Sequence, residues 1–204
     1  MKRYAGLHCN DVEVRIKSLT ITTTKTKTVI GRSQYMILSG IDPSQICLFT
    51  FTNKAANEMK ERIKSAVGEL ADKMTVGTYH SVAHRLLRKY ATYIGFNKNF
   101  TILSQDDCTK KIKNIAKELG VEDKALASYI SQKKDRVILP ATAIASAKGA
   151  ELSLANGYEK YQNALKREMA MDFDDLIINT ILLLEHNNEI RKIINSQWRY
   201  ITAK

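Results

Sequence analysis

A short, unbroken apolar run that leads through a polar turn into an amphipathic helix constrains this chain more than any other feature. The run is Ile46–Thr50, and its length and apolar character are typical of a strand buried on both faces, as in a parallel sheet. After it, Met59, Ile63 and Val67 recur every four residues among charged residues, which predicts a helix with Asn53 as its N-cap. A buried strand that runs directly into a helix indicates an α/β fold.

Further helices and strands are predicted on both sides of this strand–helix unit. Helical spacing over Thr28–Leu38 precedes the first strand, and a second short strand is predicted over Thr75–Thr78. Ser81 follows as the expected cap of another helix, and Tyr200–Ile201 has the character of a further strand. Strands that alternate with helices predict a parallel sheet.

The middle of the chain has a helical pattern. A capping box at Ser104–Asp107 opens a predicted helix that Gly120 ends, and two more helices follow. Between Cys108 and Met171 we find no strand pattern. The chain is therefore predicted to be an α/β domain, formed by residues 1–103 and 172–204, with a helical insertion at 104–171.

Charge provides the first functional indication. The formal net charge of the 204 residues is +11, and residues 1–100 carry 16 Lys and Arg against 7 Asp and Glu, a net of +9. A basic half-chain is expected of a protein that binds a polyanion. A solvated basic surface that merely promotes solubility explains the charge equally well.

Other classes of protein are disfavoured. The longest apolar stretch, Ile177–Leu184, is too short to span a membrane, and the first six residues lack the apolar core of a signal peptide. Three widely separated cysteines show no metal-ligand spacing and fit a reduced cytoplasmic protein. We therefore expect no membrane partner and no metal site.

The segment Phe49–Ile63 carries the most chemistry. It predicts a strand end, a polar turn and a helix start, which is where open α/β sheets place ligands and where backbone N–H groups favour phosphate. Lys54 and Arg62 add positive charge, and Phe51 offers an aromatic face on which a base can stack. From composition alone, the simpler alternative of a core Phe51 and a solvated Lys54 is favoured.

The amino-acid sequences of several segments resemble motifs of the superfamily 1 DNA helicases of the UvrD/Rep type. Phe49–Ile63 closely resembles their motif Ia, and Thr78–Ser81 with Arg85–Arg88 resembles motif Ib. Asp172–Ile177 is similar to the segment before their Walker B strand, and Asn99–Leu103 is typical of the junction into their helical subdomain 1B. Ordered matches of this length are far more specific than a lone short pattern.

The resemblance implies a fold and an activity. The fold would be a partial RecA-like (P-loop NTPase) parallel sheet, domain 1A, with subdomain 1B inserted. Family members are motors that use ATP and Mg²⁺ to move 3′ to 5′ along single-stranded DNA and to unwind duplexes. With the two basic residues added, the expected DNA-binding residues are Phe51, Thr52, Asn53, Lys54, Arg62, Thr78, His80 and Ser81.

Two side-chain groups have simpler alternatives. His80 can serve as a capping or core histidine, and with no acidic partner at ligand spacing it does not predict a zinc site. Asp174 and Asp175 lie on an amphipathic helix, which favours a structural or capping role over paired catalytic carboxylates.

The ATP site departs from the family pattern. Where the family has Gly-Ser-Gly-Lys-Thr, this chain has a degenerate P-loop of Thr22, Thr23, Thr24, Lys25 and Thr26. The glycines of a P-loop let backbone N–H groups curl around phosphates. The chain also stops at Ile201–Lys204, where the family strand continues into an Asp-Glu pair that holds Mg²⁺. We assign no catalytic residue and expect negligible ATP hydrolysis by this chain alone.

Three interpretations follow. The first is a fragment of an ATP-dependent 3′–5′ DNA helicase, with a second chain as a conceivable source of the remaining domains. The second is a non-catalytic module that binds single-stranded DNA. The third is a decayed gene remnant, suggested by the divergence before Lys25.

Overall fold

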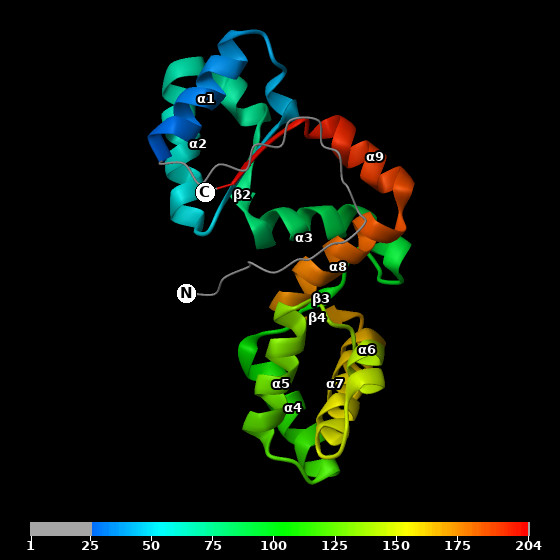
Figure 1. Cartoon of the computed structure of the whole chain (residues 1–204). Coiled ribbons are helices and arrows are strands. Elements are labelled where there is room, and N and C mark those ends of the chain that lie inside the picture. Colours follow the sequence, from blue (N-terminus) through cyan, green and yellow to red (C-terminus); the bar gives the residue numbers. More distant parts are fainter. Residues whose placement is uncertain (1–25, 204) are drawn as a thin grey trace. The chain divides into compact units, whose positions relative to one another are not determined.

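The computed structural model describes residues 26–203, and these divide into two compact units (Figure 1). One unit comprises residues 26–86 and 183–203, and the other comprises residues 87–182. We call them the α/β unit and the helical unit.

The α/β unit contains a three-stranded parallel sheet in the order β2-β1-β5. The strands are β1 (Ile46–Thr50), β2 (Thr75–Thr78) and β5 (Tyr200–Ala203). In the register, Thr50 is the partner of Thr78 and Cys47 is the partner of Ile201. All three predicted strands are thus confirmed, as is their parallel arrangement.

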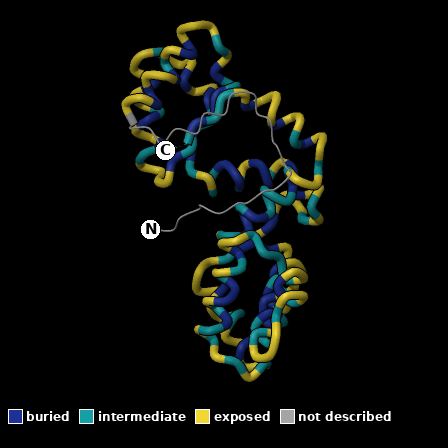
Figure 2. The backbone as a smooth tube through the Cα atoms, viewed as in Figure 1, coloured by how far each residue is buried: buried dark blue, intermediate teal, exposed yellow. Residues whose placement is uncertain are grey.

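Helices surround this sheet in chain order. They are α1 (Thr26–Leu38), the 3-10 helix η1 (Pro43–Gln45), α2 (Asn53–Val67), the 3-10 helix η2 (Gly68–Lys73), the start of α3 (Tyr79–Tyr90) and α9 (Asn188–Gln197). The core forms where Leu48 of β1 packs with Val29 of α1 and Ile63 of α2, and all three side chains are buried. Figure 2 shows that buried and exposed residues alternate along the helices of this unit. The four-residue apolar spacing of α2 therefore points into the core, as the sequence predicts.

A glycine lets β2 and α3 approach closely. A Cβ atom at Gly77 would lie 2.5 Å from the Ser81 hydroxyl oxygen and 3.4 Å from a Val82 methyl group. On the same sheet, the Trp198 indole N–H donates to the Thr75 hydroxyl over 3.1 Å and so ties the end of α9 to β2.

The helical unit contains most of the remaining elements. They are η3 (Ala91–Ile94), α4 (Gln105–Leu119), α5 (Asp123–Asp135), α6 (Pro140–Ser146), α7 (Glu151–Arg167) and most of α8 (Phe173–His186). Ser104 caps α4, and Gly120 ends it in the left-handed conformation (φ 65°), as predicted. A Cβ atom at Gly157 of α7 would lie 2.7 Å from a Leu126 methyl group, so this glycine allows α7 and α5 to pack closely.

The helical unit also contains a strand pair that the sequence did not reveal. β3 (Thr101–Ile102) and β4 (Ala170–Met171) pair in parallel. The prediction that no strand lies between Cys108 and Met171 is therefore wrong. Two residues are too few to show a period of two, so the pairing has no signal in the local pattern.

Candidate nucleic-acid interface

The carboxyl ends of β1 and β2 bring two predicted motifs together. The two strands are parallel neighbours whose last residues, Thr50 and Thr78, are register partners. Both strands therefore end at the same edge of the sheet, and α2 and α3 both begin there. Six of the predicted DNA-binding residues lie at these two helix starts: Thr52, Asn53, Lys54, Thr78, His80 and Ser81.

The N-cap of α2 is Thr52 and not Asn53. The Thr52 hydroxyl oxygen accepts from the Ala55 N–H over 3.2 Å, and Thr52 has the extended backbone of an N-cap. The buried Thr50 hydroxyl donates to the Thr52 carbonyl over 2.8 Å. Asn53 is the first helical residue, so its prediction as the cap is wrong by one position. Thr52, Asn53 and Lys54 are all exposed.

The start of α3 is capped by Thr78. Its hydroxyl oxygen accepts from the Ser81 N–H over 3.2 Å, and the Ser81 hydroxyl donates to the Thr78 carbonyl over 2.9 Å. The prediction of Ser81 as the cap is therefore wrong, because the helix begins two residues earlier, at Tyr79. Thr78, His80 and Ser81 are half-buried.

Three aromatic rings meet at this edge. The rings of Phe49 and Tyr79 stack in parallel, with centroids 4.8 Å apart and an angle of 3°. The Phe51 ring is tilted by 59° against Tyr79, with centroids 6.0 Å apart. Phe51 is 71% exposed, so the alternative that it is a core residue is wrong. Burial raises the pKa of the Tyr79 phenol, which further favours its neutral form.

Arg62 lies away from this edge. It follows Asn53 by nine residues of α2, which is about 13 Å along a helix axis. Its guanidinium pairs with Glu58 one turn earlier, and its carbonyl accepts from the Gln34 amide over 2.9 Å. The structure therefore does not bring Arg62 together with the other predicted residues.

Of the degenerate P-loop, only the last residue lies among the described residues. Thr22, Thr23, Thr24 and Lys25 lie outside the described residues, and Thr26 begins α1. Among residues 26–203, no group of three or more His, Cys, Asp or Glu side chains is placed to hold a metal ion.

The acidic segment before α8 forms a reciprocal cap. The Asp175 N–H donates to an Asp172 carboxylate oxygen over 2.9 Å, and the Asp172 N–H donates back to Asp175 over 3.2 Å. The capping role predicted for Asp175 is thus confirmed. The Lys134 ammonium of α5 bridges both carboxylates, at 2.6 Å from Asp172 and 2.7 Å from Asp175. We call these three residues the Lys134 cluster.

Burial sets the ionisation of this cluster. It raises the pKa of Asp175 to about 6, against the attraction of the Lys134 ammonium. Burial acts on Asp172 in the same sense, but the Lys134 ammonium and hydrogen bonds outweigh it and lower the pKa of Asp172. The deeper carboxyl, Asp175, is therefore the one that takes up a proton first.

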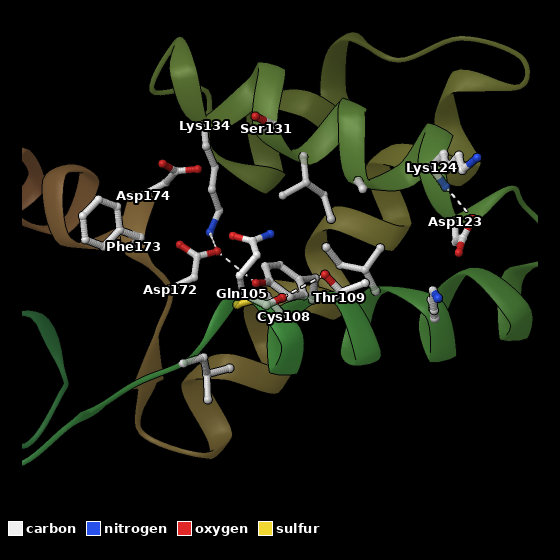
Figure 3. Close-up of a pocket in the computed structure, with 16 residues that line it drawn as sticks. Gln105, Cys108, Thr109, Asp123, Lys124, Ser131, Lys134, Asp172, Phe173 and Asp174 are labelled. Carbon is white, nitrogen blue, oxygen red and sulfur yellow. Dashed lines mark hydrogen bonds and ion pairs between the residues drawn. The ribbon is translucent and has the colours of Figure 1, made fainter.

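The Lys134 cluster adjoins a cavity of about 790 Å³ between α4, α5 and the start of α8 (Figure 3). Cys108, Ile112 and Ile130 contribute apolar surface, and Lys134 and Asp172 lie together at one end. The Tyr161 hydroxyl also donates to Asp172, over 2.9 Å. Because these buried charges already satisfy one another, the cluster is structural, and the nucleic-acid interface remains the stronger candidate.

Comparison with known proteins identifies the family. Residues 23–203 match the family described as the UvrD/REP helicase N-terminal domain. The chain belongs to this family. The α/β architecture with a short parallel sheet is accordingly that of a partial RecA-like domain with a helical insertion.

Individual relatives agree with this assignment. The chain is 35% identical over 184 residues to the ATP-dependent DNA helicase PcrA of Staphylococcus aureus, which covers 87% of this chain and 25% of the relative. It is 36% identical over 188 residues to the ATP-dependent DNA helicase UvrD1 of Mycobacterium tuberculosis, covering 87% of this chain and 24% of the relative. The chain thus spans about a quarter of the length of these curated relatives. Within residues 26–203, every helix is too short or too polar to cross a bilayer.

Proposed function

We propose that this chain provides part of the single-stranded DNA track of an ATP-dependent 3′–5′ DNA helicase. The observation that carries the proposal is the shared edge where β1 and β2 end, with two helix starts and an exposed Phe51. The relatives at 35–36% identity are named ATP-dependent DNA helicases, which supports the same class of activity for this chain.

The chemistry of the edge suits a single strand. The N–H groups at the start of α2 and the exposed Lys54 favour phosphate, and the Phe51 ring offers a stacking surface to a base. A base in a duplex is already stacked on both faces, so the ring favours unpaired strands. The net charge of +9 in residues 1–100 adds a salt-dependent attraction to the backbone.

Fluorescence anisotropy with a labelled oligo-dT tests this proposal. Binding by the 204-residue chain should weaken clearly between about 50 and 200 mM salt, because phosphate contacts release counterions. Phe51→Ala should cost ~1–3 kcal/mol of binding free energy. Tyr35→Ala is the matched control, since Tyr35 is 72% exposed but lies on α1. An affinity for oligo-dT that does not change with salt concentration would contradict the proposal. So would equal losses of affinity in Phe51→Ala and Tyr35→Ala.

ATP hydrolysis by this chain alone is not part of the proposed activity. Residues Thr22–Thr26 contain no glycine, and Thr24 stands where the family has the glycine before the P-loop lysine. A Cβ atom hinders the backbone from cradling phosphates, so the residues present do not fit an ATP-binding P-loop. Steady-state phosphate release with oligo-dT and Mg²⁺ should stay at background, and turnover of about one per second would overturn this expectation.

A non-catalytic single-strand-binding module is the second candidate, and the basic half-chain favours it. The two candidates share the same edge of the sheet. Because the P-loop residues do not fit ATP, both predict that ATP with Mg²⁺ leaves the affinity of this chain for oligo-dT unchanged. A shift of that affinity by ATP would contradict this interpretation of residues Thr22–Thr26 and favour the motor.

A further inference from the structure

We propose that Tyr79 is a second base-stacking residue, so that the β1–β2 edge holds two unpaired nucleobases of one DNA strand, one on Phe51 and one on Tyr79. This inference rests on the proposed binding of single-stranded DNA and assigns a second base position to the same edge. Tyr79 lies within the segment that resembles motif Ib, but it is not among the residues that the resemblance assigns to DNA binding.

The first reason is the rigid support of the Tyr79 ring. Phe49 belongs to the central strand β1 and stacks on Tyr79 almost in parallel, with centroids 4.8 Å apart. Tyr79 nevertheless remains 37% exposed. A ring whose orientation is fixed by packing loses little conformational freedom when a base stacks on it.

The second reason is the spacing between the two exposed rings. A base sandwiched between two rings needs about 7 Å, twice the 3.4 Å spacing of stacked bases in DNA. The Phe51 and Tyr79 centroids are only 6.0 Å apart, and their planes are tilted by 59°. No base fits between them, so each ring contacts a base of its own.

The third reason is the position of the rings beside the two helix starts. Phe51 directly precedes Thr52, the cap of α2, and Tyr79 directly follows Thr78, the cap of α3. A strand that stacks its bases on both rings would carry its phosphates past N–H groups at both starts. The repeated pairing of ring and helix start is the chemistry of a nucleic acid, in which each base comes with a phosphate.

Abasic scanning of a bound oligonucleotide tests the two base positions. In a short oligo-dT, one base at a time is removed while the phosphate is kept, and the affinity for the 204-residue chain is measured by anisotropy. Two positions should each lose about 5- to 140-fold in affinity. A single sensitive position would overturn the assignment of Tyr79.

Variants then connect one position to Tyr79. Tyr79→Leu should remove the loss at one abasic position and leave the other unchanged, whereas Phe51→Leu should do the reverse. Tyr79→Phe keeps the ring and should behave like the unmodified chain. Circular dichroism melting checks that each variant is folded. If Tyr79→Leu unfolds, abasic scanning of Tyr79→His, which offers a smaller ring, takes its place and should weaken one position only.

The outcomes separate this inference from the proposed function. If the chain binds oligo-dT in a salt-dependent manner but the Tyr79 variants leave both abasic positions unchanged, only the role of Tyr79 is wrong. If the unmodified chain fails to bind oligo-dT, the proposed function itself is wrong.

Discussion

Replacing Lys134 by Met gives the sharpest test of how the helical unit is held together. The Lys134 side chain is 1% exposed, and its ammonium lies 2.6 Å from Asp172 and 2.7 Å from Asp175, whose side chains are 12% and 3% exposed. Met has similar length but no charge, so the variant leaves two buried carboxylates facing each other across a reciprocal cap. Breaking a buried ion pair in this way costs about 3–5 kcal/mol. That is a large share of the ~5–15 kcal/mol by which a domain is stable.

The loss should depend on pH in a defined direction. Without the ammonium, burial and mutual repulsion raise the pKa of both carboxyls above the unfolded value of about 3.9. The folded variant then binds more protons than its unfolded chain, so its stability rises as pH falls. Of these two carboxyls, only that of Asp175 has a raised pKa, of about 6, in the unmodified chain, which therefore gains less stability on acidification. The difference in stability should be largest near pH 7.5 and smaller near pH 5.

Urea unfolding followed by circular dichroism at these two pH values measures the effect. Lys133→Met is the matched control on the adjacent position of α5, where the ammonium pairs with Glu151 at 3.0 Å. Glu151 is 44% exposed, so water screens this pair and its loss should matter much less. A Lys134→Met loss below about 1 kcal/mol, or a loss that is the same at both pH values, would refute the interpretation of a buried, mutually dependent cluster.

Three further predictions concern stability. Gly157→Ala should destabilise the chain by ~1–3 kcal/mol in urea unfolding, because its Cβ atom would meet Leu126 at 2.7 Å. The same change at Gly31 of α1, which has nothing within 4 Å, should instead stabilise by about 0.5–1 kcal/mol, and losses of the same size at both sites would contradict the packing argument. Thr52→Ala should cost ~1 kcal/mol by removing the α2 cap, whereas Asn53→Ala should cost less; the reverse order in thermal melts would restore Asn53 as the cap. The stability of the unmodified chain should rise as pH falls from 7 through 6, because the folded pKa of Asp175 exceeds the unfolded value, and Asp175→Asn should flatten this rise; an unchanged slope would assign it to another group.

The sheet and most helices could be predicted because their signals are local. The apolar run Ile46–Thr50 and the four-residue spacing through Ile63 each need only a few neighbouring residues to be recognised. The pairing of β3 with β4 could not be predicted, since two residues carry no period and the partners lie about 70 positions apart. Lys134 was missed for a similar reason. A lysine in an amphipathic helix is ordinarily solvated, and its partners Asp172 and Asp175 lie 38 and 41 residues away.

The sequence predicts where the candidate site lies, but it does not predict which side chains cap the helix starts there. Thr52, Thr78 and Ser81 were predicted as DNA contacts, and the structure shows their hydroxyls engaged in shaping the helix starts. At α2 the adjacent position offers another good cap, and sequence alone does not rank neighbours such as Thr52 and Asn53. The ring of Tyr79 gained its importance only from its contact with Phe49, thirty positions earlier.

These capping roles change what the motif residues can do for DNA. A Ser81 hydroxyl that donates to the Thr78 carbonyl has no second proton for a phosphate, whereas the Thr52 hydroxyl accepts from Ala55 and keeps its own. In the proposed interface, the groups best placed to contact a strand are therefore the Thr52 hydroxyl, the exposed Lys54, the first N–H groups of the helices and the rings of Phe51 and Tyr79. If the edge binds DNA as proposed, it combines phosphate contacts that do not depend on sequence with stacking that accepts any base.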